Sequence, residues 1–169
     1  LNHERGVDPA AQAVSGGGLS LKTDYADNCL IVSNVASRSG GGIAFSSGYG
    51  LVRNCTVVGN VAQQYPDHSG TYHVMGGTLV NSILVRNGNG SENLDASLNY
   101  TADHLCTTPL PSNGTGHVTA DPLLVSGWRL ATNSPCIDAG CTNGPADDYA
   151  RAIRPLDGNN DKTNAWDIG

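Results

Sequence analysis

The stretch NCLIVSN at residues 28–34 decides the fold, because the chain contains its pattern three times. The frame returns as NCTVVGN at residues 54–60 and as NSILVRN at residues 81–87, at steps of 26 and 27 residues. Runs of glycine at 16–18, 40–42 and 76–77 precede the three frames. A period of roughly 20 to 50 residues is typical of solenoid proteins. Each unit is therefore predicted to be a glycine turn, a short strand, a bend, a second short strand and an asparagine turn.

Strands this short and this regularly spaced favour an all-β solenoid over a helical one. Apolar residues do not recur at helical spacing over any long window. The glycine triplets would destabilise a helix interior. Each strand can instead pair with its equivalent one repeat away, about 4.8 Å distant. We expect a parallel β-helix with coils of about 26 residues over 1–105, and a closing coil with an irregular cap of the same domain over 106–169.

The two asparagines of each frame predict two lines of stacked residues along the solenoid. Asparagine tolerates the left-handed conformation of a tight turn, and stacked amides hydrogen-bond to one another. One line is predicted to be Asn34, Asn60 and Asn87, and the other, at the opposite end of the same strand, Asn28, Asn54 and Asn81. A surface row of asparagine that binds sugars is the alternative.

The cysteines give a second repeated position. Cys29 and Cys55 occupy the same place in successive frames, which predicts a stacked pair of buried thiols. The five cysteines include no CxxC pair, and no histidine stands beside a cysteine at zinc-like spacing. The sequence therefore predicts no zinc site.

Composition limits the partners. The net charge is −6, and the nine basic residues are scattered, which argues against nucleic acid. The apolar runs are far shorter than the roughly 20 residues of a membrane span. No signal peptide is visible and the chain begins at Leu1, so we expect a piece of a longer precursor. Its expected partners are the preceding coils of that parent chain, or other copies stacked on an open solenoid end.

Two insertions supply the candidates for surface recognition. The second unit is enlarged at 62–76 and the third at 88–104, and insertions in solenoids often form loops on the binding face. The candidate binding residues, all in the first insertion, are Tyr65, His68, Tyr72 and His73. The alternative is an ordinary capping loop packed on its own aromatic rings.

The residues that suggest catalysis are few. Asp27 precedes the first frame and Arg53 the second, which places an acid beside a base in adjacent coils, and Lys22 is the nearest other cation. A polysaccharide lyase needs a group that accepts a proton and a cation that stabilises the resulting negative charge. An ordinary cross-strand ion pair explains the same spacing.

Calcium is the one cofactor for which the sequence offers candidate ligands. Asp157, Asn159 and Asp161 carry oxygen ligands at alternate positions, and Asp167 is the candidate fourth ligand. The loop lacks the glycine and glutamate of an EF-hand. A polar turn with side-chain to backbone hydrogen bonds is the alternative.

The second half carries a family resemblance in four stretches: DPLL at 121–124, WRL at 128–130, SPCIDAG at 134–140 and DIG at 167–169. They resemble the C-terminal module of "choice-of-anchor Q" β-helix proteins. The coils resemble the right-handed, pectate-lyase-like parallel β-helix repeats of bacterial surface proteins of the polymorphic outer-membrane type. The chain departs from the family pattern at RAIRPLDG (residues 151–158) and after DIG, so the last turn is not placed by the resemblance.

The resemblance implies export and a secreted or cell-surface location in bacteria. With export assumed, it implies a disulfide between Cys106 and Cys136, with Cys136–Cys141 as the local alternative. We expect a non-catalytic structural or adhesive module that self-associates through open solenoid ends. The alternative is a carbohydrate-active enzyme, either a polysaccharide lyase or a glycoside hydrolase, or a glycan-binding β-helix.

Overall fold

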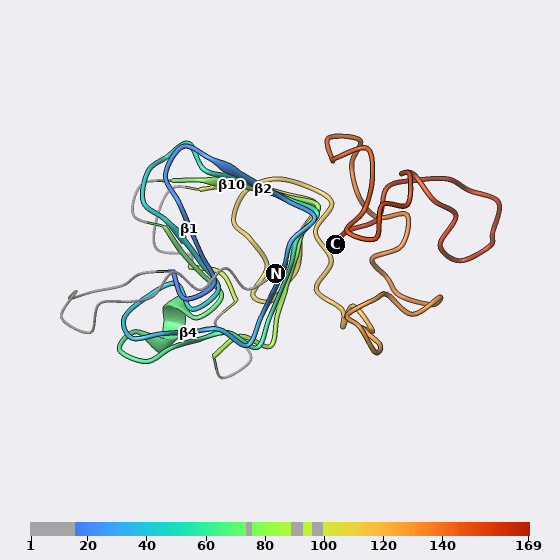
Figure 1. The fold of residues 1–169 in the computed structure, drawn as a ribbon. Helices are drawn as coiled ribbons and strands as arrows, with labels where there is room; N and C mark the ends of the chain where they lie inside the picture. The colour runs from blue at the N-terminus through green and yellow to red at the C-terminus, as the bar shows by residue number, and fades with distance from the viewer. Residues whose placement is uncertain (1–15, 74–75, 89–92, 96–99) are drawn as a thin grey trace.

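The protein is a parallel β-helix of about three turns with a long C-terminal segment packed against one side. The computed structural model describes residues 16–73, 76–88, 93–95 and 100–169. Figure 1 shows the coils stacked upon one another and the C-terminal segment (residues 119–169) lying beside one corner of the stack. The predicted all-β fold is confirmed, and the described residues contain no helix with the length and hydropathy of a membrane span.

Each coil is built from strands of two or three residues. The first coil holds β1 (Leu19–Leu21), β2 (Tyr25–Asp27), β3 (Leu30–Val32) and β4 (Val35–Ala36). The second holds β5 (Ile43–Phe45), β6 (Leu51–Arg53), β7 (Thr56–Val58) and β8 (Val61–Ala62). A 3-10 turn, η1 (Pro66–His68), leads to the third coil with β9 (Thr71–His73), β10 (Thr78–Val80) and β11 (Ile83–Val85). The last coil holds β12 (Thr101–Asp103) and β13 (Cys106–Thr107).

Equivalent strands of successive coils form parallel sheets. The two longest are the central sheet, in the order β12-β10-β6-β2, and the docking sheet, in the order β13-β11-β7-β3. The middle residue of each triplet points into the solenoid, so these residues stack in register. In the central sheet they are Ala26, Val52, Leu79 and Ala102, all buried. Burial of a Val or Leu side chain stabilises a fold by about 1.5–3 kcal/mol, so this column carries much of the core.

The third coil corrects the predicted alignment of the repeat. The glycines at 76–77 were expected to precede the equivalent of β1 and β5, but β10, which follows them, pairs with β6. The true equivalent is β9, which pairs with β5 inside the predicted insertion 62–76. Likewise β12 lies inside the predicted insertion 88–104. Gly77 is needed for another reason, because a Cβ there would lie 2.6 Å from the Phe45 ring.

The predicted asparagine ladder is confirmed at the corner after the docking sheet. The Oδ1 atom of Asn60 accepts from the backbone N–H and the side-chain amide of Asn34, at 2.9 and 3.0 Å. Asn87 repeats both bonds to Asn60, at 3.0 and 2.9 Å. The insertion supplies a fourth rung, since Asn93 repeats them to Asn87, at 2.9 and 3.0 Å.

The backbone at this corner differs from the prediction in one respect. The left-handed residues are those before the ladder, namely Ser33, Gly59 and Arg86, and not the asparagines themselves. The side-chain amides are thereby turned inward, where they satisfy buried backbone groups of the adjacent coils. At the opposite corner the asparagines do adopt the left-handed conformation, with φ values of 54, 49 and 47° at Asn28, Asn54 and Asn81.

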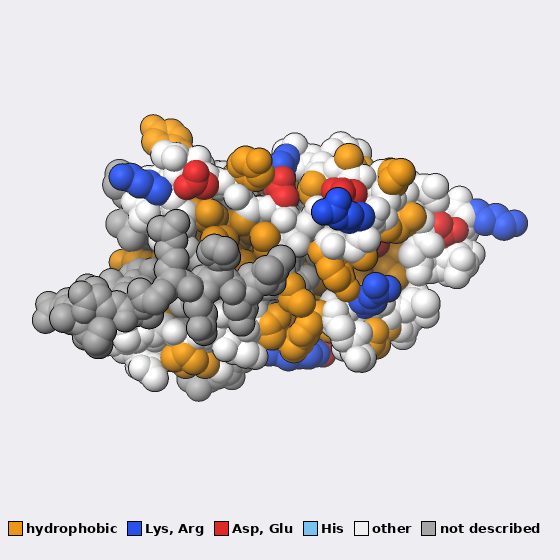
Figure 2. Space-filling model, in the orientation of Figure 1, with side chains coloured by type: hydrophobic (Ala, Val, Ile, Leu, Met, Phe, Trp, Pro, Cys, Tyr) orange, Lys and Arg blue, Asp and Glu red, His pale blue; other side chains and the backbone are white. Residues whose placement is uncertain are grey.

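A closing loop (residues 113–118) covers the far end of the solenoid. Asn113, Thr115 and His117 accept from the backbone N–H groups of Ala102, His104 and Leu105 at 2.8, 2.8 and 3.1 Å. The edge of the last coil is therefore satisfied by this loop. On the face seen in Figure 2, charged side chains lie singly or in small groups among hydrophobic and uncharged ones.

Candidate functional site

The seam between the docking sheet and the C-terminal segment is the candidate functional site. The outer face of the docking sheet is apolar, and the C-terminal segment covers it to form a second core beside that of the solenoid. The fully packed members of this second core are Val58, Ile83, Val85, Cys106, Cys136 and Ile168. The triplets of β7 and β11 are buried at every position because both of their faces are covered.

The left-handed asparagine corner holds the C-terminal segment by its backbone. Asn28 donates to the carbonyl of Asp147 at 2.8 Å. Asn54 donates to the carbonyl of Asp167 at 3.2 Å. The amide of Asn81 makes two bonds to the backbone of Cys141, donating at 2.7 Å and accepting at 2.8 Å.

The two lines of asparagines therefore have different structural roles. One stacks upon itself inside the solenoid, and the other projects outward to bind a segment more than 50 residues distant in the sequence.

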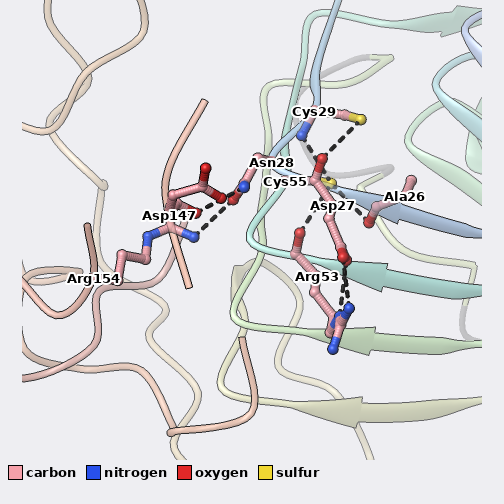
Figure 3. A network of polar contacts seen from close by, with 8 residues as sticks. All are labelled: Ala26, Asp27, Asn28, Cys29, Arg53, Cys55, Asp147 and Arg154. Carbon is pink, nitrogen blue, oxygen red and sulfur yellow. Dashed lines mark hydrogen bonds and ion pairs between the residues drawn. The ribbon is translucent and has the colours of Figure 1, made fainter. Parts of the chain in front are cut away.

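Arg154 completes this corner from the opposite side. Its guanidinium donates to the Oδ1 atom of Asn28 at 2.8 Å and to the carbonyl of Gly169 at 2.9 Å. Figure 3 shows Arg154 and Asp147 reaching Asn28 from the C-terminal segment. Burial lowers the pKa of Arg154. The guanidinium joins the first coil to the end of the described chain.

A cavity of about 200 Å³ lies within the seam. Its apolar walls include Leu30, Trp128, Tyr149 and Leu156, and its charged lining includes Asp148, Arg154 and Asp167. Burial raises the pKa of Asp167, although its carboxylate accepts from the backbone N–H of Asp138 at 2.9 Å. Aromatic rings beside carboxylates and a cation are a suitable lining for a small polar ligand such as a sugar.

One of the repeated cysteines, Cys29, lines this cavity and contacts the other. The backbone N–H of Cys29 donates to the Cys55 sulfur at 3.3 Å, so the two cysteines stack as predicted, but the expectation that both are buried is wrong for Cys29 (Figure 3). Cys55 is fully buried, whereas Cys29 is half-buried and lines the cavity. A hydrogen bond from Cys55 lowers the pKa of Cys29 to about 7, and burial raises that of Cys55.

The weak catalytic candidates do not converge on a cavity. Arg53 and Asp27 form a two-bond ion pair across β6 and β2, at 2.8 and 2.5 Å, in the register that the sequence predicted. Lys22 lies exposed in the turn after β1, and in the described part of the chain it forms no ion pair with Asp27. The acid and the base are thus paired with each other.

The aromatic recognition candidates pack largely upon themselves. The ring of His68 stacks between those of Tyr65 and Tyr72, with centroids 5.6 and 4.7 Å apart. The guanidinium of Arg38 lies 5.7 Å from the Tyr65 centroid. His73 belongs to β9, and its side chain lies outside the described part of the structure. This geometry agrees with the alternative of a self-packed loop.

The calcium candidates form a polar turn. Both carboxylate oxygens of Asp157 accept backbone N–H groups, from Asp161 and Lys162. Asn159 accepts from the Asp161 N–H, and Asp161 accepts from that of Thr163. These bonds use the oxygens that a calcium ion would need, which favours the alternative of a hydrogen-bonded turn. Asp167 lies beside this turn, since a Cβ built on Gly158 would be 3.5 Å from its Oδ2 atom, and its Oδ1 atom accepts from the backbone N–H of Asp138.

The two cysteines for which the family resemblance implies a disulfide lie together as thiols. Cys106 lies in β13 and Cys136 in the C-terminal segment, both are buried, and a hydrogen bond joins their side chains. That bond raises the pKa of Cys106 and lowers that of Cys136. Both are free thiols in this structure, and so is Cys141, the local alternative, whose sulfur lies within 4.8 Å of side-chain atoms of Asp103 and His104.

The sequence reasoning missed the seam itself. Arg154, Trp128 and Tyr149 stand in a region without repeats, so no spacing marked them. One signal was present: TVV in β7 and ILV in β11 lack the alternation of a strand with one wet face, which indicates cover on both sides.

The chain was compared with family models, curated proteins and solved structures, and no match was found in any of the three comparisons.

Proposed function

We propose that the chain is a non-catalytic structural module of a secreted or cell-surface bacterial protein, in which a short β-helix is sealed along one corner by its own C-terminal segment. The observation that carries the proposal is that the candidate polar side chains are bonded to other groups of the protein. The asparagine corner binds the C-terminal backbone, and the candidate acid and base neutralise each other.

The sequence resemblance supports the location and the role. The stretches SPCIDAG and DIG, which carry it, meet in the seam: Ile168 donates to the carbonyl of Cys136 at 2.9 Å, and Gly140 to that of Trp166 at 2.6 Å. The motif residues therefore support the docking of the segment, as expected of a module that closes a β-helix of the choice-of-anchor Q type.

An adhesive role through stacking rests on the first coil. Within the described residues β1 to β4 each end their sheet, and an open sheet edge is a template for another strand. Residues 1–15, where the predicted contact begins, lie outside the described part. Light scattering across a concentration series is expected to show growing end-to-end assemblies; a monomer at every concentration argues against self-association.

The test of the non-catalytic role compares the natural chain with Asp27→Asn. Both are incubated with acidic and neutral polysaccharides, and new reducing ends and unsaturated products are measured. We expect no turnover by either protein. Cleavage that is lost in Asp27→Asn, while its circular dichroism stays native, would overturn the proposal.

Glycan binding is the second candidate, favoured by the lining of the seam cavity. Tyr149 is half-exposed there beside Arg129, which donates to its hydroxyl at 3.2 Å. Calorimetric titration with oligosaccharides is expected to give binding that Tyr149→Ala weakens and Tyr49→Ala, at an exposed site elsewhere, leaves unchanged. Equal effects of the two substitutions, or no binding, remove this candidate.

A further inference from the structure

We propose that Asp103, His104 and Cys141 bind a divalent transition-metal ion of the zinc type across the seam. A carboxylate oxygen, a ring nitrogen and the thiol sulfur of these residues all lie within 4.8 Å of one another. They are the three ligand types that zinc uses in proteins. The sequence concealed the site because Cys141 comes from the C-terminal segment and the other two from the last coil.

The geometry of His104 points to an ion. Its Nδ1 atom is buried and lies 3.1 Å from the Oδ2 atom of Asp103, but it has no well-directed hydrogen bond among the described residues. Two ligands with bonds of about 2.0–2.1 Å in a tetrahedral site lie about 3.3 Å apart. The spacing of the two atoms therefore suits neighbours around one ion.

The carboxylate of Asp103 is already oriented. Its Oδ1 atom accepts from the backbone N–H and the hydroxyl of Thr115, both at 3.0 Å, which leaves Oδ2 toward His104. Such outer hydrogen bonds orient the ligands of metal sites.

The backbone of His104 and the closing loop restrict the position of its imidazole ring. His104 occupies the left-handed corner position that asparagine holds in the three earlier coils, with φ of 49°. Its backbone N–H donates to Thr115 at 2.8 Å. Gly116 lies under the ring, where a Cβ would come within 2.3 Å of its Cδ2 atom. The ring cannot swing toward the loop, and its buried nitrogen stays in the seam.

The backbone of Cys141 is fixed by the third coil. The amide of Asn81 grips the backbone of Cys141 in both directions, as described above. The three ligands thus stand on two rigid parts, and one ion joins them. Three protein ligands leave a fourth position of a tetrahedral site for water, and a thiolate selects zinc-like ions over Ca²⁺ or Mg²⁺.

The test uses the full chain, reduced and freed of metal with a chelator, and titrated with Co²⁺. We expect a sulfur-to-cobalt charge-transfer band in the near ultraviolet, visible bands of a four-coordinate ion, and loss of both on addition of Zn²⁺. Cys141→Ser is expected to abolish the near-ultraviolet band. His104→Asn, which restores the residue of the other coils, is expected to weaken Co²⁺ binding at least tenfold.

Cys29→Ser is the control, since it removes the other half-buried thiol and is expected to keep the full spectrum. Zn²⁺ is also expected to raise the melting temperature of the natural chain and of Cys29→Ser, but not of His104→Asn. The proposal is overturned by a folded natural chain without the sulfur band, or by a band that survives in both Cys141→Ser and His104→Asn. If Cys141→Ser does not fold, His104→Asn decides alone.

Discussion

At the residue scale, one amino acid serves two purposes according to the backbone that carries it. Asn60 follows a left-handed residue and turns its amide inward, where it meets only other amides and backbone groups. Asn81 is itself left-handed and turns its amide outward, to the backbone of Cys141. The chain therefore uses the same side chain for cohesion between coils and for attachment of the C-terminal segment.

Asn60→Ala is predicted to destabilise the protein by about 3 kcal/mol or more, because several buried partners of its amide lose their hydrogen bonds. Asn34→Ala, at the partly exposed end of the ladder, is predicted to cost about 1 kcal/mol. Urea unfolding followed by circular dichroism measures both values. Equal losses would show that the buried rungs contribute no more than the end one.

Cys29 is predicted to be the most reactive thiol. The hydrogen bond from Cys55 holds the pKa of Cys29 at about 7, so its nucleophilic thiolate forms as the pH rises through neutrality. The rate of alkylation by iodoacetamide is expected to rise between about pH 6 and 8 and then level off. Peptide mapping locates the label, and Cys55→Ala, which removes the hydrogen bond, is expected to shift the rise to higher pH. A rise centred near the usual thiol pKa in the natural chain contradicts this.

At the element scale, the repeat predicted the strands that it contains and misplaced those that insertions interrupt. The docking strands β3, β7 and β11 lie inside the repeated frames, and their existence followed from spacing alone. β9 and β12 were assigned to loops, since no frame surrounds them and their pairing depends on the coil below.

The candidate site was less accessible to sequence reasoning for a physical reason. The corner asparagines were identified as a line, but their partners lie 60 to 126 residues away in a segment without periodicity. No local pattern encodes which backbone carbonyl the amide of a corner asparagine will meet. The stacked pair Asp27–Arg53 was predicted because it lies within one period.

Asn81→Gly is predicted to detach the C-terminal segment locally. Glycine keeps the left-handed backbone but removes both bonds to Cys141, at a cost of about 2 kcal/mol. Limited proteolysis is expected to cut the segment faster than in the natural chain. Ser33→Gly, at an exposed left-handed position, is the matched control and is expected to leave the rate unchanged. Equal rates in the natural chain and Asn81→Gly would show that the clamp does not hold the segment.

At the scale of the whole molecule, two cores share one sheet. The solenoid core fills the inside of the coils, and the second core lies between the docking sheet and the C-terminal segment. A solenoid propagates contacts between neighbouring coils only. The C-terminal segment contacts the first coil through Asn28 and the third through Asn81, so it ties coils that do not touch.

A disulfide between Cys106 and Cys136 is predicted to stabilise this arrangement. The thiolate of Cys136, favoured by its lowered pKa, attacks oxidised glutathione and releases one glutathione thiolate. Cys106 then displaces the second glutathione and closes a loop of roughly 30 residues, worth about 3 to 4 kcal/mol. Both sulfurs are buried, so the reaction requires local opening of the seam and is expected to be slower than alkylation of Cys29.

Peptide mapping after oxidation is expected to find the link between β13 and the C-terminal segment, and the oxidised protein is expected to unfold at higher denaturant than Cys106→Ser under the same conditions. A Cys136–Cys141 link, or an unchanged midpoint, contradicts the prediction. Oxidation and metal binding are expected to be separable, because a disulfide between Cys106 and Cys136 leaves the thiol of Cys141 free. Zn²⁺ is therefore expected to stabilise the oxidised protein further, and the two stabilisations should add. Their sum would measure how strongly the attachment of the C-terminal segment limits the unfolding of the whole chain.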